Sequence, residues 1–89
     1  MSAPIRLEPD AVEWREVDGE IVALDRLAGE YFAVTGSGAL LWPQLVEGTT
    51  TDALAETLVA RFALERAAAL RDVERFVAAL DSRGIVTAP

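Results

Sequence analysis

The sequence has no cysteine, no histidine and no lysine, so all eight of its basic residues are arginine. It therefore lacks the side chains for a disulfide, a thiolate or imidazole metal site, a cysteine nucleophile, a Ser-His-Asp triad or a Schiff-base lysine. Asp and Glu together number 15, but their spacing fits solvated faces and helix caps better than a paired general acid and base. We expect a protein that is not an enzyme and that needs no metal and no cofactor.

Long apolar runs and an excess of positive charge are also missing. The uncharged stretches are broken by glycine or proline well before they reach the length of a membrane span. The first ten residues do not have the basic-then-apolar order of a secretion or transit signal. A net charge of −7 opposes binding to phosphate backbones. With 89 residues, 52% of them hydrophobic, the chain is expected to be one soluble, cytoplasmic domain over 1–89 that binds neither nucleic acid nor a membrane.

Three segments in the N-terminal half have the composition of β-strands: residues 12–17, 20–25 and 30–35. Asp18-Gly19, between the first two, is a dipeptide that favours a tight hairpin turn. Gly29, before the third, fits the left-handed position of a bulged hairpin. These features predict a three-stranded antiparallel meander whose third strand lies at the open edge of the sheet.

The third segment carries none of the groups that usually protect an edge strand. Lysine, proline or an inward-pointing charge normally prevents such a strand from pairing with another chain. From Tyr31 to Thr35 the sequence has none of these. Either another part of the same molecule covers this edge, or the edge accepts a peptide strand from another molecule.

After residue 36 the apolar residues recur every three or four positions, which is typical of helices. Three helices are predicted, over about 38–46, 52–62 and 65–83. Ser37 is the expected N-cap of the first, and Pro43 is expected to kink this helix or to delay its start. Gly84 is expected to end the third helix, with a short extended piece at Ile85-Val86. Strands followed by helices predict an α+β fold with the helices on one face of the sheet.

The order of short motifs over about residues 12–86 resembles the PqqD family. The motifs are Val-Asp-Gly-Glu-Ile-Val-Ala-Leu-Asp (17–25), Gly-Glu-Tyr-Phe-Ala-Val (29–34), Gly-Ser-Gly-Ala-Leu-Leu-Trp (36–42), Glu-Gly-Thr-Thr (47–50), Asp-Val-Glu-Arg-Phe-Val-Ala-Ala-Leu (72–80) and Arg-Gly-Ile-Val (83–86). Pro43 departs from the family pattern.

The resemblance implies a winged helix-turn-helix-like fold in which a three-stranded meander is followed by three helices. Family members of this kind recognise the leader of ribosomally synthesised and post-translationally modified peptides (RiPPs). They add the leader as a strand beside the third strand, against the third helix. The implied function is a peptide chaperone or adaptor that presents a precursor to a modifying enzyme or a leader peptidase. Lasso-peptide processing, radical-SAM chemistry and quinone-cofactor maturation are all compatible with these residues.

The expected peptide-binding residues come from the third strand and the third helix: Glu30, Tyr31, Phe32, Ala33, Val34 and Thr35, and Asp72, Val73, Arg75, Phe76, Ala79 and Leu80. Because side chains alternate along a strand, one pair of strand residues faces the helices and the other pair faces away. Val73 and Leu80 are also candidates for the core, as are Trp14 and Trp42.

Two other functions use the same features. A structural subunit would form a homodimer by pairing its edge strand with that of a second copy. A DNA-binding winged helix would use the arginines of the third helix, but acidic residues are interleaved with them and leave this helix nearly neutral. The charge balance disfavours DNA binding, whereas the edge strand is compatible with both leader binding and dimerisation.

Overall fold

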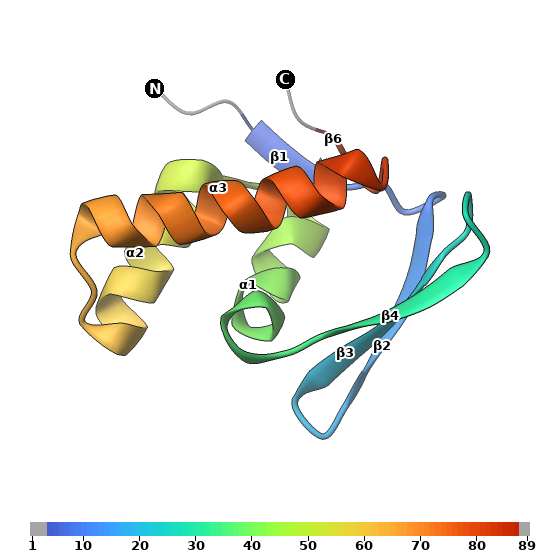
Figure 1. Cartoon of the computed structure of the whole chain (residues 1–89), viewed down its shortest axis with the longest axis horizontal. Helices are drawn as coiled ribbons and strands as arrows, with labels where there is room; N and C mark the ends of the chain where they lie inside the picture. The colour runs from blue at the N-terminus through green and yellow to red at the C-terminus, as the bar shows by residue number, and fades with distance from the viewer. Residues whose placement is uncertain (1–3, 88–89) are drawn as a thin grey trace.

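The computed structural model describes residues 4–87, which form six β-strands and three α-helices (Figure 1). The strands are β1 (Pro4–Leu7), β2 (Val12–Val17), β3 (Glu20–Asp25), β4 (Glu30–Val34), β5 (Thr49–Thr50) and β6 (Val86–Thr87). The helices are α1 (Gly36–Glu47), α2 (Thr51–Phe62) and α3 (Arg66–Ser82). This arrangement confirms the predicted α+β class and the order of strands before helices.

The larger sheet is the predicted antiparallel meander, with the strand order β2-β3-β4. Asp18 and Gly19 both have positive φ, 53° and 81°, which is the backbone of the tight hairpin turn that their sequence favours. Gly29 also has positive φ, at 70°. The predicted strands match the observed ones except at Thr35, which is the N-cap residue of α1 rather than the last residue of β4.

A second, smaller sheet was not predicted. Its order is β5-β1-β6, so β1 lies between two strands that follow it in the sequence. Each of these partners has only two residues, and β6 is shifted by one residue from the extended piece expected at Ile85-Val86. Ile5 and Leu7 on β1 are buried in the hydrophobic core. The hydrophobic core therefore includes residues that precede the first of the family-like motifs.

Helix α1 begins before Ser37, and the predicted cap was wrong. Gly36 has φ of 59° and turns the chain directly from β4 into the helix, with Thr35 as the N-cap residue. The helix continues across Pro43, although proline removes a backbone donor and costs about 3 kcal/mol in a helix interior. Leu41, on the buried side of this helix, is almost inaccessible to solvent, so burial of this face offsets the cost.

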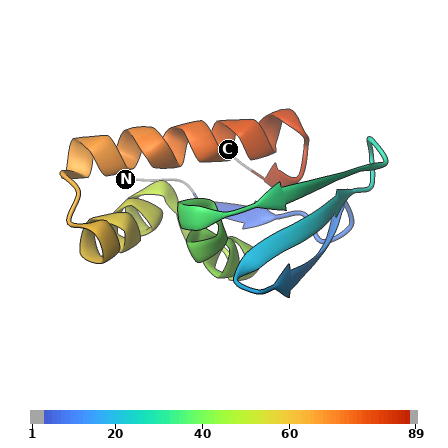
Figure 2. The same ribbon diagram turned by 60° about the horizontal axis from the view of Figure 1, so that its bottom comes forward.

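Helices α2 and α3 lie within one residue of their predicted limits. The Thr50 hydroxyl caps α2 by accepting the N–H of Ala53 at 3.1 Å. Gly84 follows α3 with φ of 73°, as expected of a residue that ends a helix. Helices α1 and α3 lie beside the meander, whereas α2 lies at the far end of the molecule against α3 (Figures 1 and 2). Within residues 4–87, no helix is both long and apolar enough to cross a bilayer.

The two tryptophans differ in burial. Trp42 on α1 is fully buried, as predicted. Trp14 is 39% exposed and lies on β2, which is the other edge strand of the meander. The two rings meet edge to face, with centroids 6.0 Å apart. Trp42 is thus a core anchor, whereas the prediction for Trp14 was wrong.

Candidate functional site

Strand β4 is an edge strand in the part of the chain that the structure describes, because β3 is its only partner there. The direction of its free backbone groups follows from the β2–β3 ladder. The N–H of Arg26 donates to the carbonyl of Ala11 at 2.9 Å, so these two residues form a hydrogen-bonded pair. In the register of the β2–β3 ladder, such pairs recur at every second residue. Because the pairs alternate in antiparallel strands, the intervening residues of β3 direct their backbone groups toward β4.

The residues of β3 that face β4 in this way are Ile21, Ala23 and Asp25, whose partners are Val34, Phe32 and Glu30. The backbone groups of Tyr31 and Ala33 therefore point away from β3, toward the open edge. This edge carries no lysine and no proline. Tyr31 and Ala33 therefore have backbone donors and acceptors without a strand partner among residues 4–87, as is typical of an edge that can accept another strand.

The open edge lies beside a groove of about 350 Å³ between β4 and α3. Residues from three elements line it: Phe32, Ala33, Val34 and Thr35 from β4 and its end, Ser37 and Gly38 from α1, and Phe76, Ala79, Leu80 and Arg83 from α3 and its end. The structure therefore brings most of the predicted strand and helix residues together along one groove.

Five predicted site residues do not line this groove. Glu30 lies at the start of β4 and pairs with Arg83. Val73 is fully buried in the core, and Arg75 is exposed on α3. Asp72 lines a neighbouring apolar cavity of about 410 Å³ that shares Ser37 with the groove. These four side chains are expected to contribute less to peptide contact than those that line the groove.

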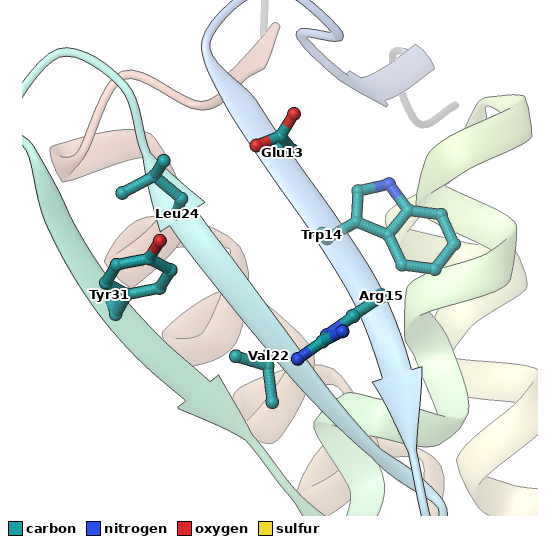
Figure 3. A pocket seen from close by; sticks show the side chains of 6 residues that line it. All are labelled: Glu13, Trp14, Arg15, Val22, Leu24 and Tyr31. Carbon is teal, nitrogen blue, oxygen red and sulfur yellow. The ribbon is translucent and has the colours of Figure 1, made fainter.

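Tyr31 is the fifth of these residues, and its position decides which face of β4 meets the helices. Its side chain is 74% exposed on the outer face of the sheet, where it lies near Leu24 and Val22 (Figure 3). Val34 is buried and Phe32 is half-buried on the inner face. The groove thus receives side chains from Phe32 and Val34, whereas Tyr31 offers an added strand only its backbone groups.

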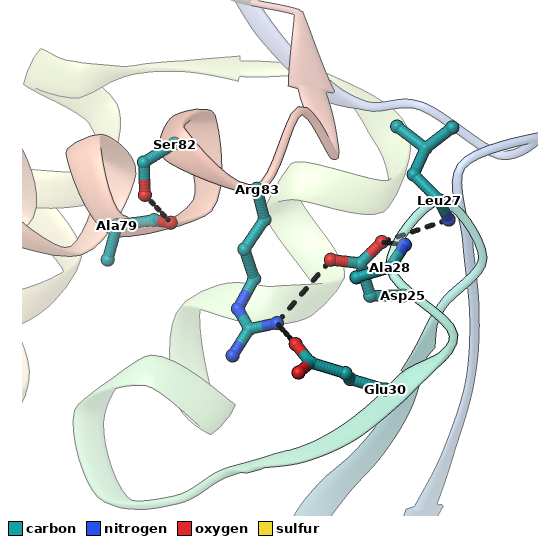
Figure 4. Close-up of polar contacts among 7 residues, drawn as sticks. All are labelled: Asp25, Leu27, Ala28, Glu30, Ala79, Ser82 and Arg83. Carbon is teal, nitrogen blue, oxygen red and sulfur yellow. Dashed lines mark hydrogen bonds and ion pairs between the residues drawn. The ribbon is translucent and has the colours of Figure 1, made fainter.

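Arg83 is a groove residue that was not predicted. Its guanidinium carbon lies 4.4 Å from the centroid of the Phe32 ring, which is a cation–π distance. Its Nη1 lies 3.4 Å from Oδ2 of Asp25 and 3.6 Å from Oε1 of Glu30 (Figure 4). Arg83 follows Phe76 and Ala79 at helical spacing, and this signal was available in the sequence.

Gly38 is a second lining residue that was not predicted, and it has no room for a side chain. A Cβ atom there would lie 2.7 Å from Cγ1 of Val34 and 3.0 Å from Cε1 of Phe76. The glycine therefore allows α1 to pack closely against one residue from each wall of the groove. Its helical backbone gave no turn signal, so only the assembled structure reveals this role.

No group of three or more acidic side chains within residues 4–87 is arranged to hold a metal ion. The charged residues at the groove form ion pairs instead. Asp25 is only 2% exposed, and its Oδ1 accepts the N–H groups of Leu27 and Ala28, both at 3.0 Å (Figure 4). With Oδ2 near Arg83, this carboxylate is satisfied by donors of the protein itself. The charged side chains at this end of the groove are thus paired with groups of the protein.

Comparison with known families agrees with this geometry. The PqqD family, described as coenzyme PQQ synthesis protein D, matches residues 20–86. The chain belongs to the PqqD family. The match covers β4 and α3, which form the two walls of the groove, and it confirms the resemblance seen in the sequence motifs.

Two solved structures are similar to this PqqD-family protein. TbiB1 in complex with the TbiA(beta) leader peptide is 27% identical, with a TM-score of 0.83, over 91% of this chain and 93% of that chain. Lasso peptide synthetase B1 complexed with the leader peptide is 29% identical, with a TM-score of 0.80, over 93% of this chain and 96% of that chain. No curated protein sequence matches the chain.

Proposed function

We propose that this PqqD-family protein is a non-catalytic adaptor that binds the leader of a RiPP precursor and presents it to a modifying enzyme or leader peptidase. The leader adds to β4 as an antiparallel strand, against α3. The observation that carries this proposal is the open edge of β4, with the backbone groups of Tyr31 and Ala33 directed outward beside the groove. The similarity of this chain to two proteins in complex with leader peptides supports the same assignment.

Edge and groove have different roles in this binding mode. Main-chain pairing with β4 contributes affinity whatever the leader sequence, and the groove selects particular side chains. Ordering a disordered leader costs a few kcal/mol, which burial of apolar side chains at roughly 25 cal/mol per Å² must offset. Phe76 and Leu80 supply apolar surface for this burial on the α3 side. Backbone pairing alone would bind many unrelated peptides.

The class of product that we propose is a lasso peptide. The basis is the 29% identity, over most of both chains, to a lasso peptide synthetase B1. In such a system the chain would deliver its leader to a separate enzyme, in agreement with the absence of cysteine, histidine and lysine from its own sequence.

Amide chemical shifts will test the binding mode. We expect that titrating a leader peptide, such as the TbiA(beta) leader bound by the similar protein TbiB1, into ¹⁵N-labelled protein shifts the amides of residues 30–38 and 76–83. The physical reason is that these residues form the edge and the lining of the groove. A DNA duplex added at the same concentration serves as the control and should leave the spectrum unchanged. Shifts confined to β2 would contradict the proposal, and a dimer that does not respond to the leader would favour the self-pairing subunit.

Replacing Gly38 with alanine is expected to weaken leader binding by about fivefold. The added methyl group would meet Val34 and Phe76 at distances that require one of them to move, and both line the groove. Alanine is also the better helix former, by about 1 kcal/mol, so the stability of the free protein should change little. Fluorescence anisotropy gives the Kd and thermal unfolding gives the stability. Unchanged Kd values for Gly38→Ala would show that the groove next to α1 is not part of the binding site.

A further inference from the structure

We infer that Arg83 is a specificity-determining residue that binds an acidic side chain of the leader, at a fixed distance from two apolar side chains. This inference rests on the proposed function, because it requires a leader strand paired antiparallel to β4. It adds the identity and the position of a charged residue in the leader.

The position follows from the register of β4. In an antiparallel added strand, the side chains that face α3 lie opposite Val34, Phe32 and Glu30, whose own side chains are on the inner face. We name the leader residue opposite Val34 p. The residue opposite Phe32 is then p+2, and the residue opposite Glu30 is p+4.

The groove presents different surfaces to these three leader positions. Near p and p+2, the lining includes the apolar residues Phe76, Ala79 and Leu80. Near p+4 it ends at Arg83, whose guanidinium lies over Phe32 and beside Glu30. The groove therefore favours apolar side chains at p and p+2 and a charged or polar side chain at p+4.

The charge that Arg83 prefers depends on which groups line the groove. Arg83 lines it, whereas its two acidic partners, Asp25 and Glu30, do not. Asp25 is buried and already accepts two backbone N–H groups. A leader side chain at p+4 lies opposite Glu30 and close to the Arg83 guanidinium. Because Glu30 is exposed and contacts Arg83 only at 3.6 Å, its side chain can turn away, and an acidic leader side chain is then the group that matches the guanidinium.

Arg83 has hydrogen-bonding capacity for this contact. Both of its ion pairs are made by Nη1, and Figure 4 shows Nη2 on the side away from the two carboxylates. The contact to Glu30 is long, at 3.6 Å, and the Glu30 side chain is 67% exposed. Such a pair contributes little, so a leader carboxylate can replace it. Asp25 then holds Arg83 in position, and Glu30 occupies the acidic subsite when no leader is bound.

A selection experiment tests this without knowledge of the natural leader. A random 12-residue peptide library displayed on phage is selected against four proteins: wild type, Arg83→Gln, Glu30→Gln and Arg71→Gln. Arg71 is exposed on α3 outside the groove, so Arg71→Gln matches the charge change of Arg83→Gln. Wild type and Arg71→Gln are expected to enrich the order apolar, any, apolar, any, acidic. Arg83→Gln is expected to keep the apolar pair and to lose the acidic preference.

Synthetic peptides then quantify the preference. For one selected sequence, the version with Glu at p+4 is expected to bind wild type about fivefold more tightly than the version with Gln, a ratio typical of a partly exposed charge-assisted contact. The ratio is expected to fall to about one in Arg83→Gln, and to rise in Glu30→Gln because the competing carboxylate is removed. Added salt should reduce the ratio in wild type. Glu30 is exposed and outside the core, so Glu30→Gln should fold normally. It therefore tests the inference independently of the stability of Arg83→Gln.

The possible outcomes separate the two proposals. If no peptide is enriched by any of the four proteins, the proposed leader binding fails. If the apolar pair is enriched without an acidic preference, or with lysine at p+4, leader binding stands and the role of Arg83 is wrong. The role of Arg83 would also be wrong if the affinity ratio between the peptides with Glu and Gln at p+4 were the same for wild type and for an Arg83→Gln protein that circular dichroism shows to be folded.

Discussion

Replacing Ala33 with proline is expected to weaken leader binding by at least about tenfold. The N–H of Ala33 points toward the open edge of β4, so proline removes a donor that an added strand needs and places its ring in the path of that strand. Proline is tolerated at such a position in an edge strand, because no hydrogen bond to β3 is lost. The free protein should therefore remain folded. Fluorescence anisotropy with labelled leader measures the loss.

The control for this change is Ala33→Ser, which keeps the backbone N–H and adds only a hydroxyl group to an exposed side chain. Its affinity for the leader should stay close to that of wild type. Circular dichroism and thermal unfolding of Ala33→Pro show whether the meander is intact. An intact Ala33→Pro protein with wild-type affinity would exclude strand addition to β4 as the binding mode.

Replacing Trp42 with alanine is expected to lower the free energy of unfolding by about 3–5 kcal/mol, the range for deleting a large buried aromatic side chain. Trp42 is fully buried, and its ring contacts Trp14 from the meander, so the change removes contacts between α1 and the sheet. A small domain is stable by only about 5–15 kcal/mol, so this loss is a large fraction of the total. Urea unfolding monitored by far-ultraviolet circular dichroism measures it.

Two variants separate the causes of this loss. Trp42→Phe keeps an aromatic ring and removes the indole N–H, which is buried without a hydrogen-bond partner among residues 4–87. Its cost should be well below that of Trp42→Ala, because no polar group is left unpaired by the change. Trp14→Ala should also cost less, since Trp14 is 39% exposed. A larger loss for Trp14→Ala than for Trp42→Ala would mean that the meander, not α1, carries the main aromatic anchor.

Local signals in the sequence were sufficient for the meander and the helices. Asp18 and Gly19 specify the hairpin turn because both residues readily adopt the positive φ values that it requires. This local preference does not depend on contacts with distant segments. The apolar spacing of α3 predicted its limits to within one residue at each end. The open edge of β4 followed from composition and strand order together.

Features that depend on packing between distant segments could not be predicted from local signals. β1 pairs with two strands of only two residues each, and neither has a pattern of its own. Tyr31 and Phe32 are both aromatic, so composition did not decide which of them faces the helices. Gly38 and Arg83 belong to the groove because α1 and α3 converge on β4.

The two walls of the groove also differ in when they become available to a growing chain. Both hairpins of the meander close over short loops, so β4 can be in place before α3 has been synthesised. The edge is then open without the α3 side chains that we propose select the leader, and an unpaired edge promotes association between incomplete chains. A chain truncated before α3 should accordingly aggregate through β4 rather than select a peptide. In the proposed binding mode, selectivity arrives only with the last helix, as a property of the completed domain.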